Sequence, residues 1–381
     1  MRKRPIDWYT LIPVLLLLCI GVIMVLSASS GTIGAEILGQ KPGATEASDP
    51  YKYFNKQLIS VSIGLVVMLV AANFRYVKLK KFVKPAAYIG VGLLIIVFGF
   101  AAKNGAHSWI IIGERQFQPS EMVKFCLILV LANIISIKKD KIRSFEHGLL
   151  PALIAIGIVC VLVVAEPDLG TALVIAITSF AMLFAGGARL PHLAALGGAG
   201  IGLTVMAVVM TPYRFARWLA FIDPFKDPRG SGYQIIQSLY AIGSGGLMGA
   251  GLGQSMQKFG HVPEQHTDFI FSILSEELGF IGASFIIILF IFFAARGYRI
   301  AKNSRDTFGS LLACGITTMI LVETVINIAV VTSSMPVTGI TLPFISFGGS
   351  SLIFKLAAVG VLLNISRYVK KEERQLTENN V

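Results

Sequence analysis

Charged residues are scarce in this chain of 381 residues, since Asp, Glu, Lys and Arg together make up 14% of it. An ordinary soluble domain carries about 25% of these residues. Hydrophobic residues make up 55% of the chain, and its mean hydropathy is +0.74. The shortage of charge excludes a soluble globular domain and indicates a protein that lies mainly in a membrane.

Motifs for disulfides, metals and nucleotides are also lacking. The cysteines lie inside apolar segments and share no spacing, so neither a disulfide framework nor a zinc site is expected; they are Cys19, Cys126, Cys160 and Cys314. The five histidines show no ligand spacing such as HExxH, and no Walker motif is present. The glycine-rich run over residues 243–253 lacks the strand and βαβ unit of a dinucleotide-binding loop. We therefore expect no nucleotide cofactor and a re-entrant turn at this run, with backbone contact to a phosphate as the alternative.

Long apolar runs, by contrast, recur along the whole chain. A membrane span needs about 20 apolar residues. Runs that meet or approach this length cover residues 11–28, 58–73, 86–102, 119–137, 149–165, 169–185, 190–210, 269–294, 308–332 and 349–363. They predict an all-α integral membrane protein, one polytopic domain over residues 1–381, with about ten transmembrane helices. The first run is as long as a full span, so we expect it to be retained rather than cleaved as a signal peptide.

Lys and Arg gather at both termini and in alternate connections between the apolar runs. These basic segments lie within residues 2–4, 75–84, 138–143, 296–305 and 367–374. By the positive-inside rule they face the cytoplasm, which places both termini inside and makes the number of spans even. The same topology accounts for the net charge of +12 without nucleic acid as a partner.

Two connections on the opposite side stand out by their length. Residues 29–56 are polar and glycine-rich, and we expect little structure there. The second, a large extracytoplasmic loop over residues 211–268, includes an amphipathic helix around residues 233–242. Long ordered loops are usually functional, so we expect the outer face to carry the active site.

Three charged residues of the large loop are candidates for chemistry. Arg214 and Arg217 are one helical turn apart and could hold a diphosphate together, or they could be interfacial anchors. Asp268 directly precedes the eighth apolar run, at a dry boundary where a carboxylate can act as a base. The alternative for Asp268, or for Thr267 beside it, is a cap on the following helix.

Charged residues also occur inside the apolar runs, at Glu121, Lys124, Glu276, Glu277, Glu323 and Lys355. Each would cost roughly 2.5–3.5 kcal/mol if it faced lipid, so we expect these side chains to face the protein interior. They either pair with one another or line a wet substrate pathway.

Segments spread along nearly the whole chain resemble the signatures of the SEDS family, whose members include FtsW, RodA and SpoVE. The matching segments are 118–124 (QPSEMVK), 166–171 (EPDLGT), 243–258, 263–269 (PEQHTDF) and 343–351 (PFISFGGSS). The resemblance implies a peptidoglycan glycosyltransferase that polymerises lipid II into β-1,4-linked strands on the outer face of the bacterial cytoplasmic membrane, in cell division or sporulation septum synthesis. It also implies a class B penicillin-binding protein, divisome proteins and membrane lipids as partners. Residues 254–258 and 363–368 favour the FtsW or SpoVE branch over RodA.

The same resemblance assigns roles to individual residues. It implies that Asp268 is the essential acidic residue, and it points to substrate-binding positions at Glu121, Lys124, Arg214, Arg217, Lys258, Glu264, His266 and Ser350. Two features depart from the family pattern as we expect it. His107 and Ser108 precede Trp109 where an arginine is expected nearby, and Lys355 is unexpected in the last span.

These assignments suggest an inverting transfer in which one carboxylate suffices, because diphosphate leaves without a general acid. Our hypothesis makes Asp268 the base for the acceptor 4-hydroxyl, while Arg214, Arg217 or Lys124 hold the diphosphate. A divalent cation, Mg²⁺ or Mn²⁺, is the cofactor left open. The alternatives are a lipid II flippase, for which we find no internal repeat, and a division scaffold without enzymatic activity.

Overall fold

The computed structural model describes residues 5–37, 51–100, 108–112, 115–259, 262–263 and 265–369. Its long helices are α1 (Trp8–Ile37), α2 (Tyr51–Asn73), α3 (Val83–Ile96), α4 (Pro119–Lys138), α5 (Leu150–Ala165), α6 (Leu169–Ala185), α7 (Leu190–Val209), α10 (Ile270–Lys302), α11 (Thr307–Val331) and α12 (Gly349–Ser366). Within the described residues, nine apolar segments containing these helices are long enough to cross a membrane, and α6 is somewhat shorter. Each predicted span coincides with one of these helices, so the predicted all-α membrane fold is confirmed.

The largest differences from the predicted elements lie at helix ends. Helix α10 continues to Lys302 and so includes basic residues that were assigned to a connection, because an α-helix can extend beyond the apolar part of a span. The connection expected over residues 29–56 is also shorter, since α1 reaches Ile37 and α2 begins at Tyr51. Residues 38–50 of that connection lie outside the described residues.

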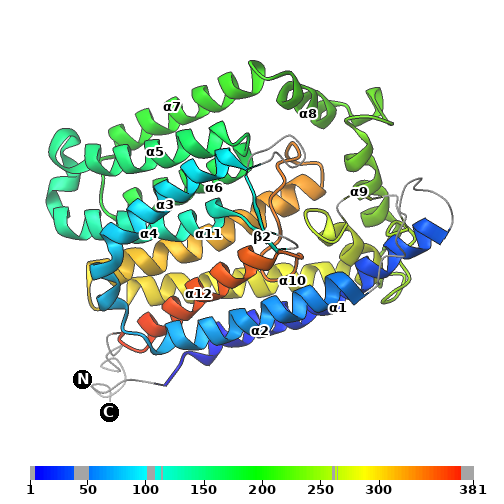
Figure 1. The fold of residues 1–381 in the computed structure, drawn as a ribbon, viewed down its shortest axis with the longest axis horizontal. Coiled ribbons are helices and arrows are strands. Elements are labelled where there is room, and N and C mark those ends of the chain that lie inside the picture. Colours follow the sequence, from blue (N-terminus) through cyan, green and yellow to red (C-terminus); the bar gives the residue numbers. More distant parts are fainter. Residues whose placement is uncertain are drawn as a thin grey trace, which may run out of the picture.

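The helices form a bundle with two distinct ends (Figure 1). The turns between α2 and α3, between α4 and α5 and between α10 and α11 lie at the same end as the start of α1 and the end of α12. These are the basic connections of the sequence. The opposite end carries the long excursion between α7 and α10.

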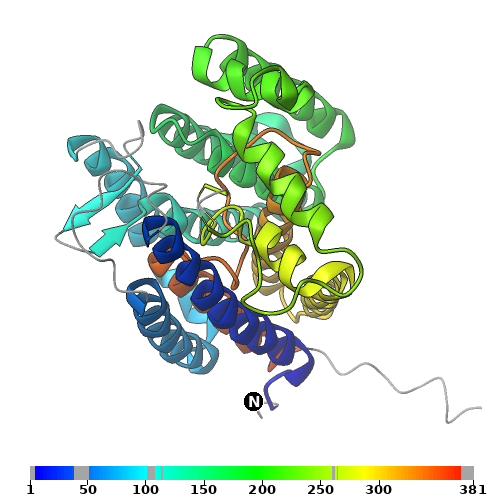
Figure 2. The same ribbon diagram turned by 90° about the vertical axis from the view of Figure 1, so that its right-hand side faces the viewer.

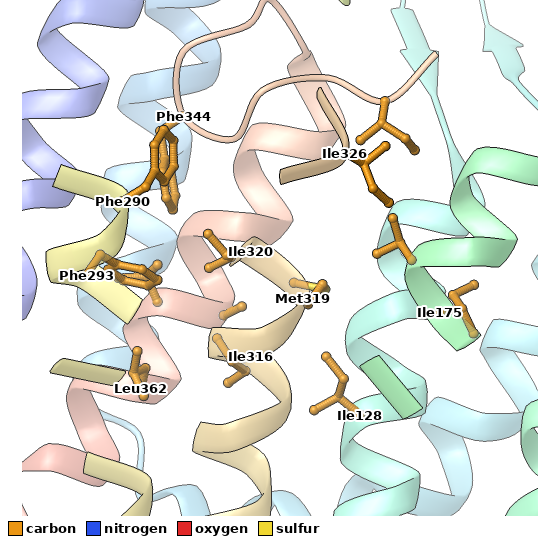
Figure 3. Packing of buried hydrophobic residues seen from close by; sticks show 14 of the residues in the cluster. Ile128, Ile175, Phe290, Phe293, Ile316, Met319, Ile320, Ile326, Phe344 and Leu362 are labelled. Atoms are coloured by element: carbon orange, nitrogen blue, oxygen red, sulfur yellow. The ribbon is translucent and has the colours of Figure 1, made fainter. Parts of the chain in front are cut away.

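Helix α11 lies at the centre of the bundle, packed against α4, α6 and α10, while α12 packs mainly against α2. Figure 3 shows Ile316, Met319 and Ile320 of α11 directed into this core. By contrast, Leu193 is the only buried residue of α7, which packs on α6 and α8.

The excursion is ordered rather than a simple loop. It contains α8 (Pro212–Ile222), the 3₁₀ turn η5 (Pro224–Lys226) and α9 (Tyr233–Ser244), and α9 confirms the predicted amphipathic helix. A short antiparallel hairpin of β1 (Ile110–Ile112) and β2 (Arg115–Phe117) pairs Ile110 with Phe117. Figure 2 looks onto this end and shows the hairpin on one side and α8 and α9 on the other.

The glycine-rich run packs against a break in α10. Gly279 has φ 67° and ψ −170°, so the helical hydrogen bonds across this point are lost. The glycine loop, residues 245–253, replaces them: the amides of Ala250 and Gly251 donate to the carbonyls of Glu276 and Glu277 at 2.9 and 3.0 Å. In return, the carbonyl of Gly246 accepts from the amide of Phe280 at 2.9 Å. The loop is therefore a re-entrant turn that completes a membrane helix, and these two amides are already used within the protein.

Candidate active site

The short loop over residues 337–340 contacts several elements at the end of the bundle that carries the excursion. The carbonyl of Val337 accepts a hydrogen bond from Arg217 Nη1 of α8 at 3.1 Å. Asn327 of α11 donates from Nδ2 to the carbonyl of Ile340 at 2.7 Å and to the carbonyl of Asp268 at 2.8 Å. The loop therefore brings Arg217 of the excursion and Asp268 to the same place.

The Asp268 carboxylate lies against the backbone of Gly339. A Cβ added at Gly339 would stand 3.6 Å from Asp268 Oδ2, and Gly339 has φ +78°. The start of α6 approaches the same loop, since a Cβ at Gly170 would be 2.6 Å from the carbonyl oxygen of Thr338. Glycine at both positions permits the close approach of these three segments.

The N-cap position of α10 is occupied by Phe269, whose side chain forms no capping hydrogen bond. Asp268 directly precedes this position, and its side chain is partly buried beside Gly339. The catalytic and capping interpretations of Asp268 both stay predictions from the sequence.

The segment before Asp268 is held by the loop that precedes α12. Ser346 Oγ donates to the carbonyl of Thr267 at 2.7 Å, and the amide of Phe347 donates to the carbonyl of His266 at 2.8 Å. The His266 ring lies 4.4 Å from the Tyr53 ring and 5.8 Å from the Phe347 ring, measured between centroids. His266, a predicted substrate-binding residue, is thus part of an aromatic cluster that supports the Asp268 segment.

The two arginines of α8 point toward the bundle and contact carbonyl groups. Arg214 donates to the carbonyls of Ala207 and Val164, each at 3.4 Å. The Arg217 guanidinium also lies 4.4 Å from the centroid of the Tyr213 ring. Within the part of the chain that the structure describes, neither arginine forms an ion pair. Both positive charges are therefore available for an anionic ligand.

Four charged residues of the spans form a closed cluster, the buried tetrad Glu121, Lys124, Glu323 and Lys355. Lys124 Nζ lies 2.8 Å from Glu121 Oε1 and also binds Glu323, while Lys355 Nζ lies 3.1 Å from Glu323 Oε2 and 3.9 Å from Glu121 Oε2. Each residue is at most 8% exposed. The formal charges cancel, so these residues pair with one another.

This pairing bears on the predicted substrate-binding roles of Lys124 and Glu121, which stay predictions. The ammonium group of Lys124 is bound by two carboxylates inside the bundle and is not free to hold a diphosphate. A substrate-binding role for Glu121 meets the same objection, because its carboxylate faces Lys124 and Lys355. In this structure, the ion pairs of both residues link α4 to α11 and α12.

Lys258 is also enclosed by protein, being 1% exposed. Its ammonium group donates to the carbonyl of Gly253 at 2.7 Å and to Ser27 Oγ and Glu277 Oε1 at 3.2 Å each. The neighbouring Glu276 carboxylate accepts the amide of Met256 at 3.0 Å. These contacts tie the end of the glycine loop to α1 and α10, and they favour a structural role for Lys258 over the predicted contact with substrate.

A second pair of carboxyl groups lies in the turn between α5 and α6. Burial raises the pKa of Glu166 to about 8, and the negative charge of Asp168 adds to this shift. Within the described residues, neither buried carboxylate oxygen of Glu166 has a hydrogen-bond partner. Burial also raises the pKa of Asp168, although its side chain accepts the amide of Thr171 at 2.9 Å. The sequence motif at residues 166–171 identifies this turn, whereas the burial of the Glu166 carboxyl is seen only in the structure.

The remaining candidates lie near that turn or outside the described residues. Ser350 Oγ accepts the amide of Gln118 at 3.3 Å, and Gln118 Nε2 donates to Asp168 Oδ2 at 3.3 Å. Glu264 and His107 lie outside the described residues. Among the described residues, no three His, Cys, Asp or Glu side chains are grouped so that they could hold a metal ion.

Comparison with known proteins gives a consistent result. A family model described as cell cycle protein FtsW/RodA/SpoVE matches residues 7–371. Stage V sporulation protein E of Bacillus subtilis is 45% identical over 96% of this chain and 98% of its own length. The probable peptidoglycan glycosyltransferase FtsW of Trichlorobacter lovleyi is 41% identical over 97% of this chain and 95% of its own.

Solved structures show the same fold. A chain from a peptidoglycan synthase complex that coordinates polymerization and crosslinking aligns with a TM-score of 0.76 and 31% identity, over 95% of this chain and 98% of that one. The rod shape determining protein RodA of Thermus thermophilus aligns with a TM-score of 0.70 and 28% identity, over 96% and 98%. From its sequence, its relatives and its fold, the chain belongs to the FtsW/RodA/SpoVE family.

Proposed function

We propose that this chain is a peptidoglycan glycosyltransferase of cell division or sporulation, which polymerises lipid II into β-1,4-linked glycan strands. The names of its relatives and its full-length family match support this activity. The observation that carries the proposal is the placement of the Asp268 carboxylate and of Arg217 at one loop, residues 337–340.

In the proposed reaction, Asp268 removes the proton from the 4-hydroxyl of the acceptor sugar. The hydroxyl oxygen attacks the anomeric carbon of the donor, and the bond from that carbon to the diphosphate breaks. Direct displacement inverts the α-linked donor to a β-linked product. A correctly placed general base contributes about 10²–10⁴-fold to such a step.

Arg214 and Arg217 would bind the diphosphate that leaves as undecaprenyl diphosphate. Their charges are not neutralised by described carboxylates, and guanidinium groups bind phosphate oxygens in a bidentate manner. Stabilisation of the developing negative charge replaces a general acid. A divalent cation, Mg²⁺ or Mn²⁺, would add to this effect through phosphate oxygens and the Asp268 carboxylate.

The positions of the basic connections support an orientation in the bacterial cytoplasmic membrane. The start of α1 and the end of α12 lie at the basic end of the bundle, so we assign this end and both termini to the cytoplasm. Asp268 and the α8 arginines then face outward, where nucleotides are absent and a lipid diphosphate supplies its own leaving group. The structural likeness to a complex that coordinates polymerization with crosslinking supports a class B penicillin-binding protein as partner, together with other divisome proteins.

The test is glycan polymerisation from purified lipid II, with and without a class B penicillin-binding protein, in Mg²⁺, Mn²⁺ or EDTA. We expect polymer from the native chain and a loss of about 10²–10⁴-fold in the Asp268→Asn variant. Asp227→Asn is the matched control, because Asp227 is an exposed carboxylate of the same excursion that only closes a local turn.

An Asp268→Asn variant with native activity would overturn the catalytic assignment. Movement of labelled lipid II across vesicles without polymer in any condition would instead favour a flippase. The pairing of the buried tetrad within the protein argues against a wet pathway at that point in the bundle.

A further inference from the structure

Lys355 is the member of the buried tetrad that contacts the loop leading into α12. Its ammonium group lies 2.6 Å from Ser351 Oγ within α12, and 3.4 Å from Thr341 Oγ1. The side chain is 3% exposed, so these contacts and Glu323 replace water around the charge. Lys355 thus joins the charges of the spans to the loop over residues 341–348, which we call the support loop.

The support loop binds the backbone of the two residues before Asp268. Its Ser346 side chain donates to Thr267, and its Phe347 amide donates to His266, as described above. Ser346 Oγ also accepts the amide of Leu342 at 2.8 Å, which closes the loop on itself. The loop therefore connects the Lys355 side chain to the backbone directly before Asp268.

A second route from Lys355 to Asp268 runs through α11. Lys355 pairs with Glu323 at 3.1 Å, and Asn327 follows Glu323 one helical turn later. Asn327 donates to the backbone carbonyls of both Asp268 and Ile340. A shift of Glu323 would therefore displace Asn327, which holds the backbone carbonyl of Asp268.

The charge of Lys355 decides whether Glu323 can stay where it is. Without this charge, Glu121, Lys124 and Glu323 would carry a net charge of −1 in a buried site. Removing one partner of a buried pair leaves an uncompensated charge, which is relieved by movement, by entry of water or by uptake of a proton, and each of these changes the contacts of Glu323. Both routes described above would carry that movement to residues 266–268.

We propose that Lys355 is a positioning residue for glycosyl transfer: it fixes the support loop and Glu323 so that the Asp268 carboxylate stays beside Gly339. This inference rests on the proposed function for its activity readout. It goes beyond that function because Lys355 touches neither the reacting atoms nor the α8 arginines. A misplacement of about 1 Å at a catalytic group can cost about 10²-fold in rate.

The experiment compares Lys355→Met, Lys355→Arg and the double variant Lys355→Met with Glu323→Gln in the full-length chain. Lys302→Met, an exposed lysine at the other end of the bundle, is the control. We expect Lys355→Met to lower kcat for polymerisation about 10- to 100-fold with little change in KM for lipid II, and Lys355→Arg to recover most of it. Rates are normalised to folded, monodisperse protein, so a defect in folding alone leaves kcat unchanged.

The double variant separates positioning from charge balance. In the double variant the four tetrad positions carry no net charge, so we expect the apparent Tm to return to the native value. We expect kcat to stay reduced, because the contact from residue 355 to Thr341 is still missing. Full recovery of kcat in the double variant, or native kcat in folded Lys355→Met, would overturn the proposal.

Hydrogen–deuterium exchange supplies a readout that does not depend on catalysis. We expect Lys355→Met to increase exchange in residues 265–269 and 337–348 relative to the native chain and to Lys302→Met. Unchanged exchange would contradict the positioning role. If the native chain makes no polymer, the proposed function fails, whereas the exchange measurement still decides whether Lys355 holds these segments.

Discussion

The Glu166 carboxyl is buried beside Asp168 and has no hydrogen-bond partner in the part of the chain that the structure describes, and this has a consequence for pH. Its pKa is raised from 4.5 to about 8 in the folded protein, chiefly by burial. Between these two values the folded state holds a proton that the unfolded state has released. Stability from this residue is therefore fully present below about pH 4.5 and is lost as the pH rises through about 8.

We therefore expect Glu166→Gln to raise the apparent Tm at pH 8 relative to the native chain and to change it little near pH 5. Thermal unfolding in detergent at both pH values measures the difference. Glu146→Gln, at an exposed glutamate of the opposite end, should leave the profile unchanged. An equal shift at both pH values would show that Glu166 is ionised in the folded state.

The sequence identifies which charged residues lie inside the spans, but it does not show which of them contact one another. A spacing of three residues was enough to place Glu121 and Lys124 on one helix face. It could not show that Lys355 and Glu323, from two other helices, complete the same tetrad, because that depends on how helices pack. Asn327 gave no signal, since one amide in an apolar run says nothing about which carbonyls it meets.

Among the elements, the glycine loop and α10 depend most directly on each other. Gly249 has φ +83°, and a Cβ there would lie 2.2 Å from the carbonyl oxygen of Glu277. Any side chain would push the loop away from the break at Gly279. The hydrogen bonds that replace the missing helical ones would then be lost.

We expect Gly249→Ala to destabilise the protein by about 1–3 kcal/mol or more, because strain and a backbone clash act together. Gly243→Ala is the matched control, since it lies on α9 with open space around its Cβ position. The apparent Tm should fall by several degrees in the first variant and stay the same or rise slightly in the second. Equal apparent Tm values for the two variants would mean that the glycine loop does not bind α10 tightly.

Not all elements could be predicted from the sequence. The prediction of α9 succeeded because its apolar residues recur with helical spacing. Helix α8 was not assigned, although Pro212 at its first turn is a usual start signal, because it is short and follows a span directly. The break in α10 was also missed, since one glycine in an apolar run is often tolerated without a break.

At the scale of the whole molecule, each of the ten apolar runs corresponds to a helix, and within the described residues nine of these helices lie in segments long enough to cross a membrane. Their arrangement around α11 did not follow from the sequence, because apolar residues face both lipid and protein and so carry little directional information. The assignment of the basic end to the cytoplasm is a prediction from the positions of the basic residues.

Cysteine labelling measures this orientation. In a chain without its four native cysteines, we expect Arg229→Cys, in the excursion, to react with a membrane-impermeant maleimide in intact cells. Lys302→Cys, at the basic end, should react only after permeabilisation. Both positions are exposed in the structure, so access from the proper side is not blocked by protein. The reverse pattern would place the termini and the basic connections outside.

The break in α10 also determines how force passes through the molecule. In a continuous helix, backbone hydrogen bonds transmit a bend from one turn to the next. At Gly279 these bonds go to the glycine loop instead, so the turns of α10 before Gly279 are bonded to the excursion. We therefore expect the long part of α10 after Gly279 to tilt with the surrounding bilayer while the turns before it, and residues 266–268 attached to them, keep their geometry.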